Sequence, residues 1–192
     1  MRTKRPRSSV HVLGVMYRKT MDSLDEQYYN ACDGLCYAET QEEANYSIEV
    51  FRELYEYQHA GATMELASMY ETGKWLEQDE EKSLLLFKEA LNLECFYAGI
   101  SIANIFFRRN DIKNGLIFLE KAADNNVNLA LTMLGQMYEK GDRVIKDKVR
   151  ALKYYERAAA NDDSEGKIGK FRLRVNIRNE NSEDRKWAWP AK

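Results

Sequence analysis

Histidine and cysteine are the side chains of this 192-residue chain best suited to catalysis or metal binding. The two histidines are His11 and His59, and His59 stands two residues before Gly61 in a predicted turn. For such a histidine, a helix C-terminal cap or a solvated position is a commoner role than general-base catalysis. Cys32 and Cys36 lie four residues apart on one helix face, but no nearby Cys or His completes a tetrahedral ligand set. We expect both cysteines to pack in a core, and we predict no metal and no cofactor.

Paired acidic residues could also do chemistry, and the chain has three adjacent pairs, Glu42-Glu43, Glu80-Glu81 and Asp162-Asp163. Adjacent carboxylates on a helix point away from one another, so they do not converge as a catalytic pair must. Acidic residues at helix starts ordinarily complement the helix dipole. The sequence also has no Gly-rich phosphate loop. We therefore predict no catalytic residues and a protein that is not an enzyme.

The composition limits the possible partners and location of the chain. Hydrophobic residues make up 44% and charged residues 31% of the sequence, and no apolar run approaches the roughly 20 residues of a spanning helix. Three cysteines without a disulfide spacing favour a reducing compartment, and we expect the cytoplasm. Without a long apolar run we do not expect membrane insertion. The net charge is −2 and basic residues gather near the two ends, so we do not expect a nucleic-acid partner.

The elements that would position any site follow from a repeated pattern of a small residue, any residue, an apolar residue and an aromatic residue. Its period is 33, then 36, then 32 residues. It occurs in four places: Gly34-Leu-Cys-Tyr37, Ala67-Ser-Met-Tyr70, Ala103-Asn-Ile-Phe106 and Gly135-Gln-Met-Tyr138. The small residue would let two helices approach closely, and the aromatic residue would fill the space beside the contact.

A second apolar series follows each of these motifs at helical spacing. Its central members are Phe51, Phe87, Leu119 and Tyr155. The flanking members, three residues before and after, are Ile48, Leu84, Leu116 and Leu152, and Leu54, Ala90, Ala122 and Ala158. Each unit is therefore predicted to be two antiparallel amphipathic helices.

Residues typical of turns separate the predicted helices. Gly73 and Gly141 come three residues after the aromatic, where a helix ends in a left-handed residue. Asn110-Asp111 replaces this glycine with a tighter turn. The prolines, Pro6 and Pro190, lie outside the repeats.

Residues 130–141, together with 147–160, carry the clearest family signature. The first stretch reads small residue, Leu-Gly, Tyr, Gly, and the second reads Asp-x-x-x-Ala-x-x-Tyr-Tyr-x-x-Ala-Ala. This pattern resembles a Sel1 repeat of the tetratricopeptide-like superfamily. Residues 62–92 are similar, with Ser83 in place of the expected alanine, and residues 98–125 and 24–58 resemble it less closely.

The resemblance implies an all-α fold, a right-handed solenoid of about four αα-hairpins with non-repeat tails. We place a basic arm at 1–22, the repeat domain at 23–163 and a C-terminal cap or basic tail at 164–192. The repeat units would span about 23–60, 61–96, 97–127 and 128–163. A degenerate terminal unit is expected, because end repeats cap the stack.

The resemblance also implies that the first helix of each unit lines the concave groove of the solenoid. The residue after the small one, and the residue four further on, should then face that groove. These predicted partner-binding residues are Ser68, Thr72, Asn104, Arg108, Gln136 and Lys140. Because the set becomes basic towards the C-terminus, we predict a groove that accepts an acidic or carboxylate-bearing segment, against the alternative of a solvated polar face.

The C-terminal tail has a different pattern, in which Phe171, Leu173, Val175 and Ile177 alternate with polar residues. This period of two favours a strand over a helix. The segment would either cap the last unit or act as an extended arm that joins a partner's sheet. Trp187 and Trp189, beside Pro190, would be interface anchors or would fold back on the stack.

The predicted function is a protein–protein interaction module, an adaptor or scaffold that holds a partner protein or peptide in the groove. The alternative is an immunity-type inhibitor that neutralises a toxin or enzyme by stoichiometric binding, with the acidic series between Asp22 and Glu56 covering a basic active site.

Overall fold

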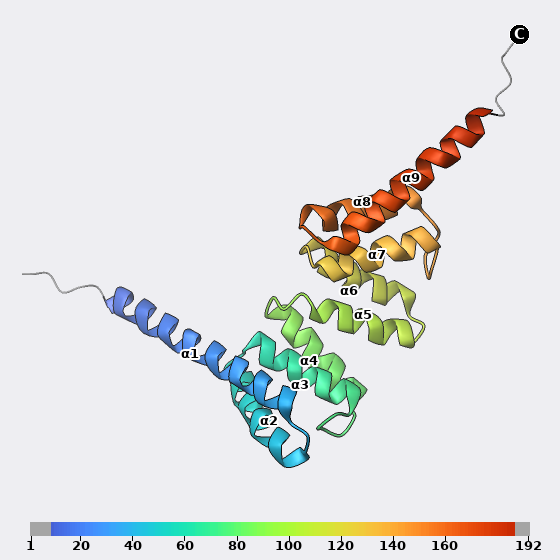
Figure 1. Cartoon of the computed structure of the whole chain (residues 1–192). Coiled ribbons are helices and arrows are strands. Elements are labelled where there is room, and N and C mark those ends of the chain that lie inside the picture. Colours follow the sequence, from blue (N-terminus) through green and yellow to red (C-terminus); the bar gives the residue numbers. More distant parts are fainter. Residues whose placement is uncertain (1–8, 187–192) are drawn as a thin grey trace, which may run out of the picture. The chain divides into compact units, whose positions relative to one another are not determined.

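The computed structural model describes the backbone of residues 9–186 and the side chains of residues 23–180. Over this range all of the regular secondary structure is α-helical, in the elements labelled in Figure 1. They are α1 (Ser9–Tyr37), α2 (Gln41–Glu56), α3 (Ala60–Thr72), α4 (Glu80–Asn92), α5 (Ala98–Arg108), α6 (Ile112–Asp124), α7 (Asn128–Lys140), α8 (Lys148–Ala160) and α9 (Ser164–Lys186). The basic residues expected to begin the arm, Arg2 to Arg7, and the tryptophans 187 and 189 lie outside the described residues.

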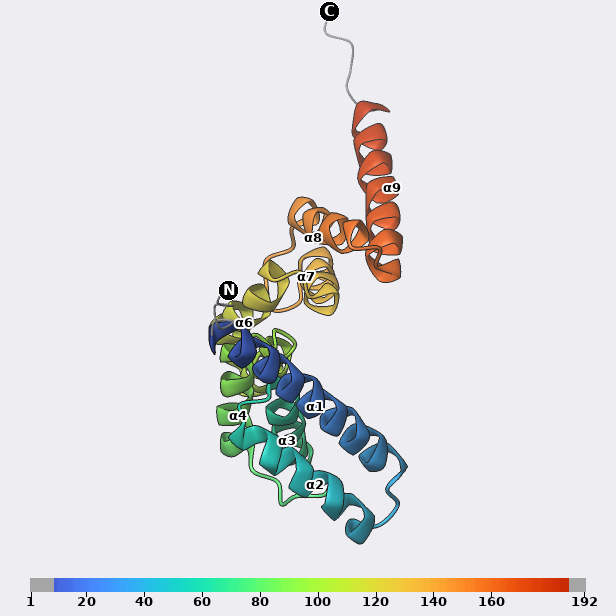
Figure 2. The same ribbon diagram turned by 90° about the vertical axis from the view of Figure 1, so that its left-hand side faces the viewer.

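The chain divides into two compact units, Met1–Cys95 and Phe96–Lys192. The first contains α1 to α4 and the second contains α5 to α9. Within each unit the helices pack as consecutive hairpins: α1 with α2 and α3 with α4 in the first, α5 with α6 and α7 with α8 in the second (Figures 1 and 2). The predicted all-α fold of helical repeats is confirmed.

The second helix of each hairpin buries the apolar series found in the sequence. Phe51, Phe87 and Leu119 are 0% exposed and Tyr155 is 1% exposed. Burial of one such side chain contributes about 1.5–3 kcal/mol, so this apolar series is a main source of stability. It also fixes which face of each second helix meets the first helix of its hairpin.

The ends of the helices follow the residues that typically cap them. Asp79, Asp111 and Asp147 cap the N-termini of α4, α6 and α8, because each side chain accepts a hydrogen bond from a backbone N–H in the first turn. Gly73 and Gly141 end α3 and α7 with φ of 70° and 77°, as predicted.

Left-handed residues that are not glycine also occur in turns, both within the α5–α6 hairpin and between hairpins. Asn110 makes the predicted tight turn with φ of 59°, and Asp111 then begins α6. The same conformation occurs at Gln58, Glu94 and Asn126, after α2, α4 and α6. Each second helix therefore stops at a corresponding position of its repeat.

The first hairpin departs from the predicted pattern. The small residue that is buried in α1 is Ala31, at 1% exposure, whereas Tyr37 is 81% exposed. Gly34 lies against Ser47 of α2, since a Cβ there would approach the Ser47 hydroxyl to 2.8 Å. The pattern is thus shifted by three residues, so Ala31 corresponds to Ala67 and Gly34 takes the place of the aromatic. Helix α1 also begins at Ser9, where an arm extending to residue 22 was expected.

The C-terminal segment is a helix, and the strand expected over residues 171–177 is wrong. Helix α9 packs on α8 and α7. The alternating apolar residues divide between opposite faces of the helix, because Leu173 is 1% exposed and Phe171 is 74% exposed. Close contact with α8 is possible because Gly169 has no side chain, and a Cβ there would lie 2.6 Å from the ring of Tyr155.

Candidate functional site

Two hollows of similar size lie between the first helices of consecutive hairpins. The α1–α3 hollow has a volume of about 400 Å³, and the α5–α7 hollow has a volume of about 420 Å³. The α1–α3 hollow is lined by Cys32, Leu35, Cys36, Glu65, Ser68, Met69, Thr72, Lys74 and Trp75. The α5–α7 hollow is lined by Asn104, Phe107, Arg108, Met133, Gln136, Met137, Lys140, Asp142 and Arg143.

All six residues predicted to bind a partner line one of these hollows. Ser68 and Thr72 belong to the α1–α3 hollow. The other four, Asn104, Arg108, Gln136 and Lys140, come together in the α5–α7 hollow. The structure therefore brings each predicted set to one surface within its unit, and the role of these residues in binding stays a prediction.

The two hollows are the same part of the repeat. Each α3 or loop residue of the first hollow has a counterpart 68 residues later in the second hollow. Glu65, for example, corresponds to Met133, and Trp75 corresponds to Arg143. The facing walls have a common spacing too, with three residues of α1 and three of α5 at i, i+3 and i+4. Trp75 and Arg143 also have the same backbone conformation, with φ of 73° and 60°.

The α5–α7 hollow is positively charged. Arg108, Lys140 and Arg143 line it, against one carboxylate from Asp142. Arg143 donates to Asp142 at 2.8 Å, and its guanidinium carbon lies 5.1 Å from the centroid of the Phe107 ring. The ring of Phe107 in turn lies over Gly115 of α6, where a Cβ would come within 2.3 Å of it. The Phe107 ring can thus take this position only because residue 115 is a glycine.

Helix α9 reaches the edge of the same hollow. The Gln136 side-chain amide donates a hydrogen bond to Glu165 of α9 at 2.7 Å. Further along α7, Glu139 accepts hydrogen bonds from Tyr155 at 2.8 Å and from Arg172 of α9 at 2.7 Å. Burial alone would raise the pKa of Glu139, but the Arg172 and Tyr155 hydrogen bonds outweigh it and lower that pKa. These contacts hold α9 against the helix that carries Gln136 and Lys140.

The α1–α3 hollow contains a partly buried carboxylate, that of Glu65. Burial raises the pKa of Glu65, and a hydrogen bond with the Tyr28 hydroxyl opposes that rise. Burial also raises the pKa of the Cys32 thiol. Because Glu65 lines the hollow, it is available to a group that enters.

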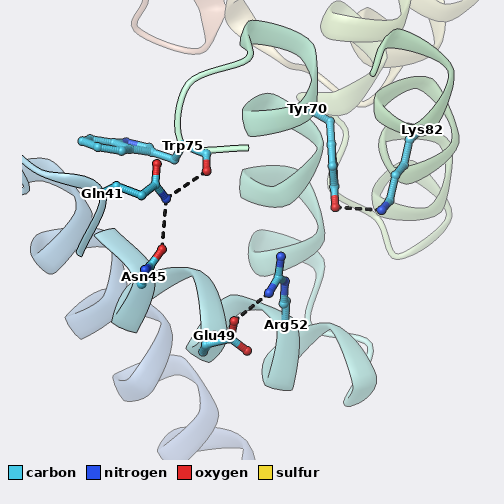
Figure 3. A network of polar contacts seen from close by, with 7 residues as sticks. All are labelled: Gln41, Asn45, Glu49, Arg52, Tyr70, Trp75 and Lys82. Atoms are coloured by element: carbon cyan, nitrogen blue, oxygen red, sulfur yellow. Dashed lines mark hydrogen bonds and ion pairs between the residues drawn. The ribbon is translucent and has the colours of Figure 1, made fainter. Parts of the chain in front are cut away.

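Trp75 also lines this hollow. Its backbone carbonyl accepts a hydrogen bond from the Gln41 side chain of α2 at 3.1 Å, and Gln41 also donates to Asn45 at 3.0 Å (Figure 3). The ammonium of Lys74 lies 5.0 Å from the centroid of the indole ring. The loop that carries Trp75 is therefore fixed to α2, and the indole already has a cation near one face.

The residues first considered for chemistry have other roles. Cys36 is exposed and lines the hollow, so its predicted core position is wrong. The reason is that the repeat pattern of α1 is shifted by three residues, which places Ala31 in the buried position. The side chain of His59 caps the N-terminus of α3, and neither a C-terminal cap nor a solvated position describes it. Its other ring nitrogen contacts Asp25 at 3.1 Å. His11 lies in the part of α1 whose side chains are not described.

The described residues form neither a metal site nor a membrane-spanning helix. No group of three or more His, Cys, Asp and Glu side chains between residues 23 and 180 is arranged to hold a metal ion. Among the helices described, none is long and apolar enough to cross a membrane.

The sequence analysis did not predict the loop residues that line the hollows, and it did not predict Glu65. Lys74, Trp75, Asp142 and Arg143 lie in loops, where no helical period indicates which side chain faces the hollow. Glu65 shares the helix face of Ser68 and Thr72, three and seven residues before them, so the helical spacing would have found it.

Comparison with solved structures shows what this arrangement resembles. A Sel1 repeat protein from Oxalobacter formigenes superposes with a TM-score of 0.66 at 19% identity, over 85% of this chain and 77% of that one. The protective antigen c5321 of uropathogenic Escherichia coli, which has an SLR fold, gives 0.59 at 20% identity, over 75% and 32%. The Pseudomonas aeruginosa protein PA5086 gives 0.57 at 27% identity, over 72% and 53%. This chain thus spans only part of the length of the last two proteins.

Comparison with curated proteins gives no significant match. The family model described as Sel1 repeat matches residues 60–95, 106–127 and 128–163. The first and last of these stretches are the hairpins α3–α4 and α7–α8, and the middle one contains α6. The structure and this match agree that the chain is built on Sel1 repeats, three of which lie within residues 60–163.

Proposed function

We propose that this chain is a protein-interaction module that holds an acidic segment of a partner protein in the α5–α7 hollow. Sel1 repeats generally mediate protein–protein interactions, which supports the general class. The observation that carries the specific proposal is the convergence of Arg108, Lys140 and Arg143 on one hollow with the amides of Asn104 and Gln136.

The chemistry of these groups suits a carboxylate-bearing ligand. Guanidinium and ammonium groups form charge-assisted hydrogen bonds with carboxylates, and side-chain amides add neutral donors. The Phe107 ring and the methionines Met133 and Met137 supply apolar surface in the same hollow. A segment that combines acidic and apolar residues would satisfy both parts of this surface. The module needs no bound cofactor for this, and we place its action in the cytoplasm.

The test is a binding assay with two matched peptides labelled with fluorescein. One carries glutamates around a leucine, and the other carries glutamines in the same places. Fluorescence anisotropy should show tighter binding of the acidic peptide to the intact chain, and added salt should weaken that binding. The variant Arg108→Glu with Lys140→Glu should bind at least about tenfold more weakly, since losing one charge-assisted hydrogen bond costs about 1.5–3 kcal/mol.

A matched control separates the hollow from the charge of the whole unit. Lys113→Glu with Lys121→Glu makes the same charge change at exposed positions of α6. Circular dichroism should show that both double variants keep their helices. Equal weakening by the two double variants would rule out the hollow as the binding site.

A second candidate function, the stoichiometric inhibitor, is favoured by the charge of the first unit. Residues 23–95 contain 17 Asp and Glu against four Lys and Arg. A surface of this kind attracts basic proteins and repels acidic ones. A single basic partner bound in a one-to-one complex by the first unit alone would support the inhibitor over the adaptor.

A further inference from the structure

The α1–α3 hollow differs in chemistry from its counterpart in the second unit. At the positions of Lys140 and Arg143 it has Thr72 and Trp75, and at the position of Met133 it has Glu65. Cys36 stands in place of Arg108, and Lys74 stands in place of Asp142. The first hollow thus has one cation where the second has three, and it has a carboxylate on α3 and an indole in the loop. We propose that the α1–α3 hollow binds an arginine side chain from a basic segment of a partner, with Glu65 as the anionic contact and Trp75 as the aromatic contact.

Glu65 is the first observation that supports this assignment. A partly buried carboxylate is costly unless a cation or several hydrogen bonds compensate it. Burial raises the pKa of this carboxyl, and the hydroxyl of Tyr28 is a neutral partner that only partly offsets the effect. Within the described part of the chain, no cation pairs with Glu65. An arginine entering the hollow would supply the missing charge and up to two parallel hydrogen bonds.

Trp75 is the second observation. The hydrogen bond from Gln41 fixes its backbone beside the hollow (Figure 3). The Lys74 ammonium lies 5.0 Å from the indole centroid, which shows that a cation fits against this ring. Trp75 also keeps a left-handed backbone, with φ of 73°, and such a conformation in a bulky residue is retained only where the surroundings require it.

The second unit contains a direct precedent for the proposed contact. There, the guanidinium of Arg143 lies 5.1 Å from the Phe107 ring centroid, inside the equivalent hollow. In the first unit Leu35 takes the position of Phe107, the aromatic residue is Trp75 of the loop, and no arginine of that unit lines the hollow. An arginine from outside would place a guanidinium against an aromatic ring in this hollow too, with the ring supplied by the loop and not by the first helix.

Arginine fits this hollow better than lysine for two reasons. The guanidinium is planar, so it can stack on an indole and bind both oxygens of a carboxylate at once. It is also more weakly hydrated than an ammonium, which lowers the cost of entering a partly buried site. The excess of acidic residues in the first unit would raise the rate at which a basic segment arrives. The assignment does not depend on what the α5–α7 hollow binds.

The test uses the full chain and three short fluorescein-labelled peptides that are identical except at one central residue. That residue is arginine, lysine or citrulline, the last being a neutral analogue of arginine with nearly the same shape. Fluorescence anisotropy should give the lowest Kd for arginine, a Kd at least about threefold higher for lysine, and the weakest binding for citrulline. Equal binding of the citrulline peptide, or of the lysine peptide, would overturn the assignment to a guanidinium.

Two variants and one control locate the site. Glu65→Gln and Trp75→Leu should each weaken the arginine peptide by about tenfold and should leave the citrulline peptide unchanged. Glu53→Gln removes the same charge from an exposed position of α2 and should have little effect. If Glu53→Gln weakened binding as much as Glu65→Gln, the attraction would belong to the acidic surface as a whole and the proposed site would be wrong. Glu65→Gln keeps the side-chain shape and removes a partly buried charge, so it should fold.

Discussion

Replacement of Tyr155 by phenylalanine tests whether the contacts between α7, α8 and α9 work as one network. The ring of Tyr155 is 1% exposed, and a Cβ at Gly135 or at Gly169 would come within 2.8 Å or 2.6 Å of it. Phenylalanine preserves this packing. The substitution therefore removes only the hydroxyl, which donates to Glu139 at 2.8 Å.

The expected loss of stability follows from the partners of Glu139. A hydrogen bond to a charged acceptor contributes about 1.5–3 kcal/mol. Glu139 keeps two hydrogen bonds from Arg172, at 2.7 Å and 3.2 Å, so its carboxylate is not left without donors. We therefore expect Tyr155→Phe to lower the free energy of unfolding by about 1–2 kcal/mol at pH 7.

The loss should depend on pH in a defined direction. The pKa of Glu139 in the folded chain is lowered, so its interactions add stability above its ordinary value of 4.5 and lose that contribution as the pH falls below it. Part of that lowering comes from Tyr155. The difference between Tyr155→Phe and the native chain should thus be constant from pH 7 down to about 4.5 and should shrink at lower pH.

Urea unfolding followed by circular dichroism at 222 nm measures these free energies. A double-mutant cycle with Arg172→Met should show that the effects of Tyr155 and Arg172 are not additive, because both side chains donate to one carboxylate. A loss that stays the same at pH 7 and pH 3.5, or an additive cycle, would refute the network.

Three other predictions follow from single positions. Ser83→Ala should raise the urea midpoint and add about 1 kcal/mol, since the buried Ser83 hydroxyl has no hydrogen-bond partner among the described residues. Cys36, which is exposed, should react with Ellman's reagent before Cys32, whose thiol pKa burial raises; serine variants of Cys32, Cys36 and Cys95 assign the phases, and the reverse order would contradict the structure. Gly115→Ala should displace the Phe107 ring, lower stability by about 1–3 kcal/mol in a thermal melt and weaken acidic-peptide binding; unchanged binding would separate that ring from the site.

Much of the fold could be predicted because two local signals agree along the sequence. The buried series through Phe51, Phe87 and Leu119 recurs at helical spacing, and the capping residues between helices stop each helix at a definite place. The helical spacing of the apolar residues and the positions of the capping residues are properties of the local sequence. They do not depend on which partner helix lies nearby, so sequence alone reveals them.

The first hairpin was harder to predict because its buried face is chosen by its neighbours. Gly34-Leu-Cys-Tyr37 has the right residue types, yet Ala31 occupies the buried position and Tyr37 lies exposed near the end of α1. Both registers present a small residue to α2. Only the packing of α1 against that helix decides between them, and the sequence contains no direct record of it.

The tail shows the opposite kind of error, in which a real pattern had the wrong meaning. Leu173 and Ile177, four residues apart, pack towards the core, while Phe171 and Val175 are exposed on the other face of α9. Two i, i+4 pairs offset by two residues look like a strand in sequence. The glycines at 166 and 169, which permit close contact with α8, were the overlooked signal of a packed helix.

If the residues that line the hollows set their specificity while the buried series sets the fold, the chemistry of one hollow can be transferred to the other. The transfer is made in the background of Arg108→Glu with Lys140→Glu, so that the native hollow does not contribute. The substitutions, each installing the counterpart from the second unit, are Cys36→Arg, Glu65→Met, Thr72→Lys, Lys74→Asp and Trp75→Arg.

None of the five replaced side chains belongs to the buried core, so the helical signal in circular dichroism should persist. The variant should gain binding of the acidic peptide and lose binding of the arginine peptide. Its Kd for the acidic peptide should be up to about tenfold higher than that of the native hollow, because the acidic residues of the first unit oppose the ligand and tenfold corresponds to about 1.4 kcal/mol. A folded variant that bound neither peptide would show that these five side chains do not define the site, which then also needs the remaining lining residues or the arrangement of α5 and α7.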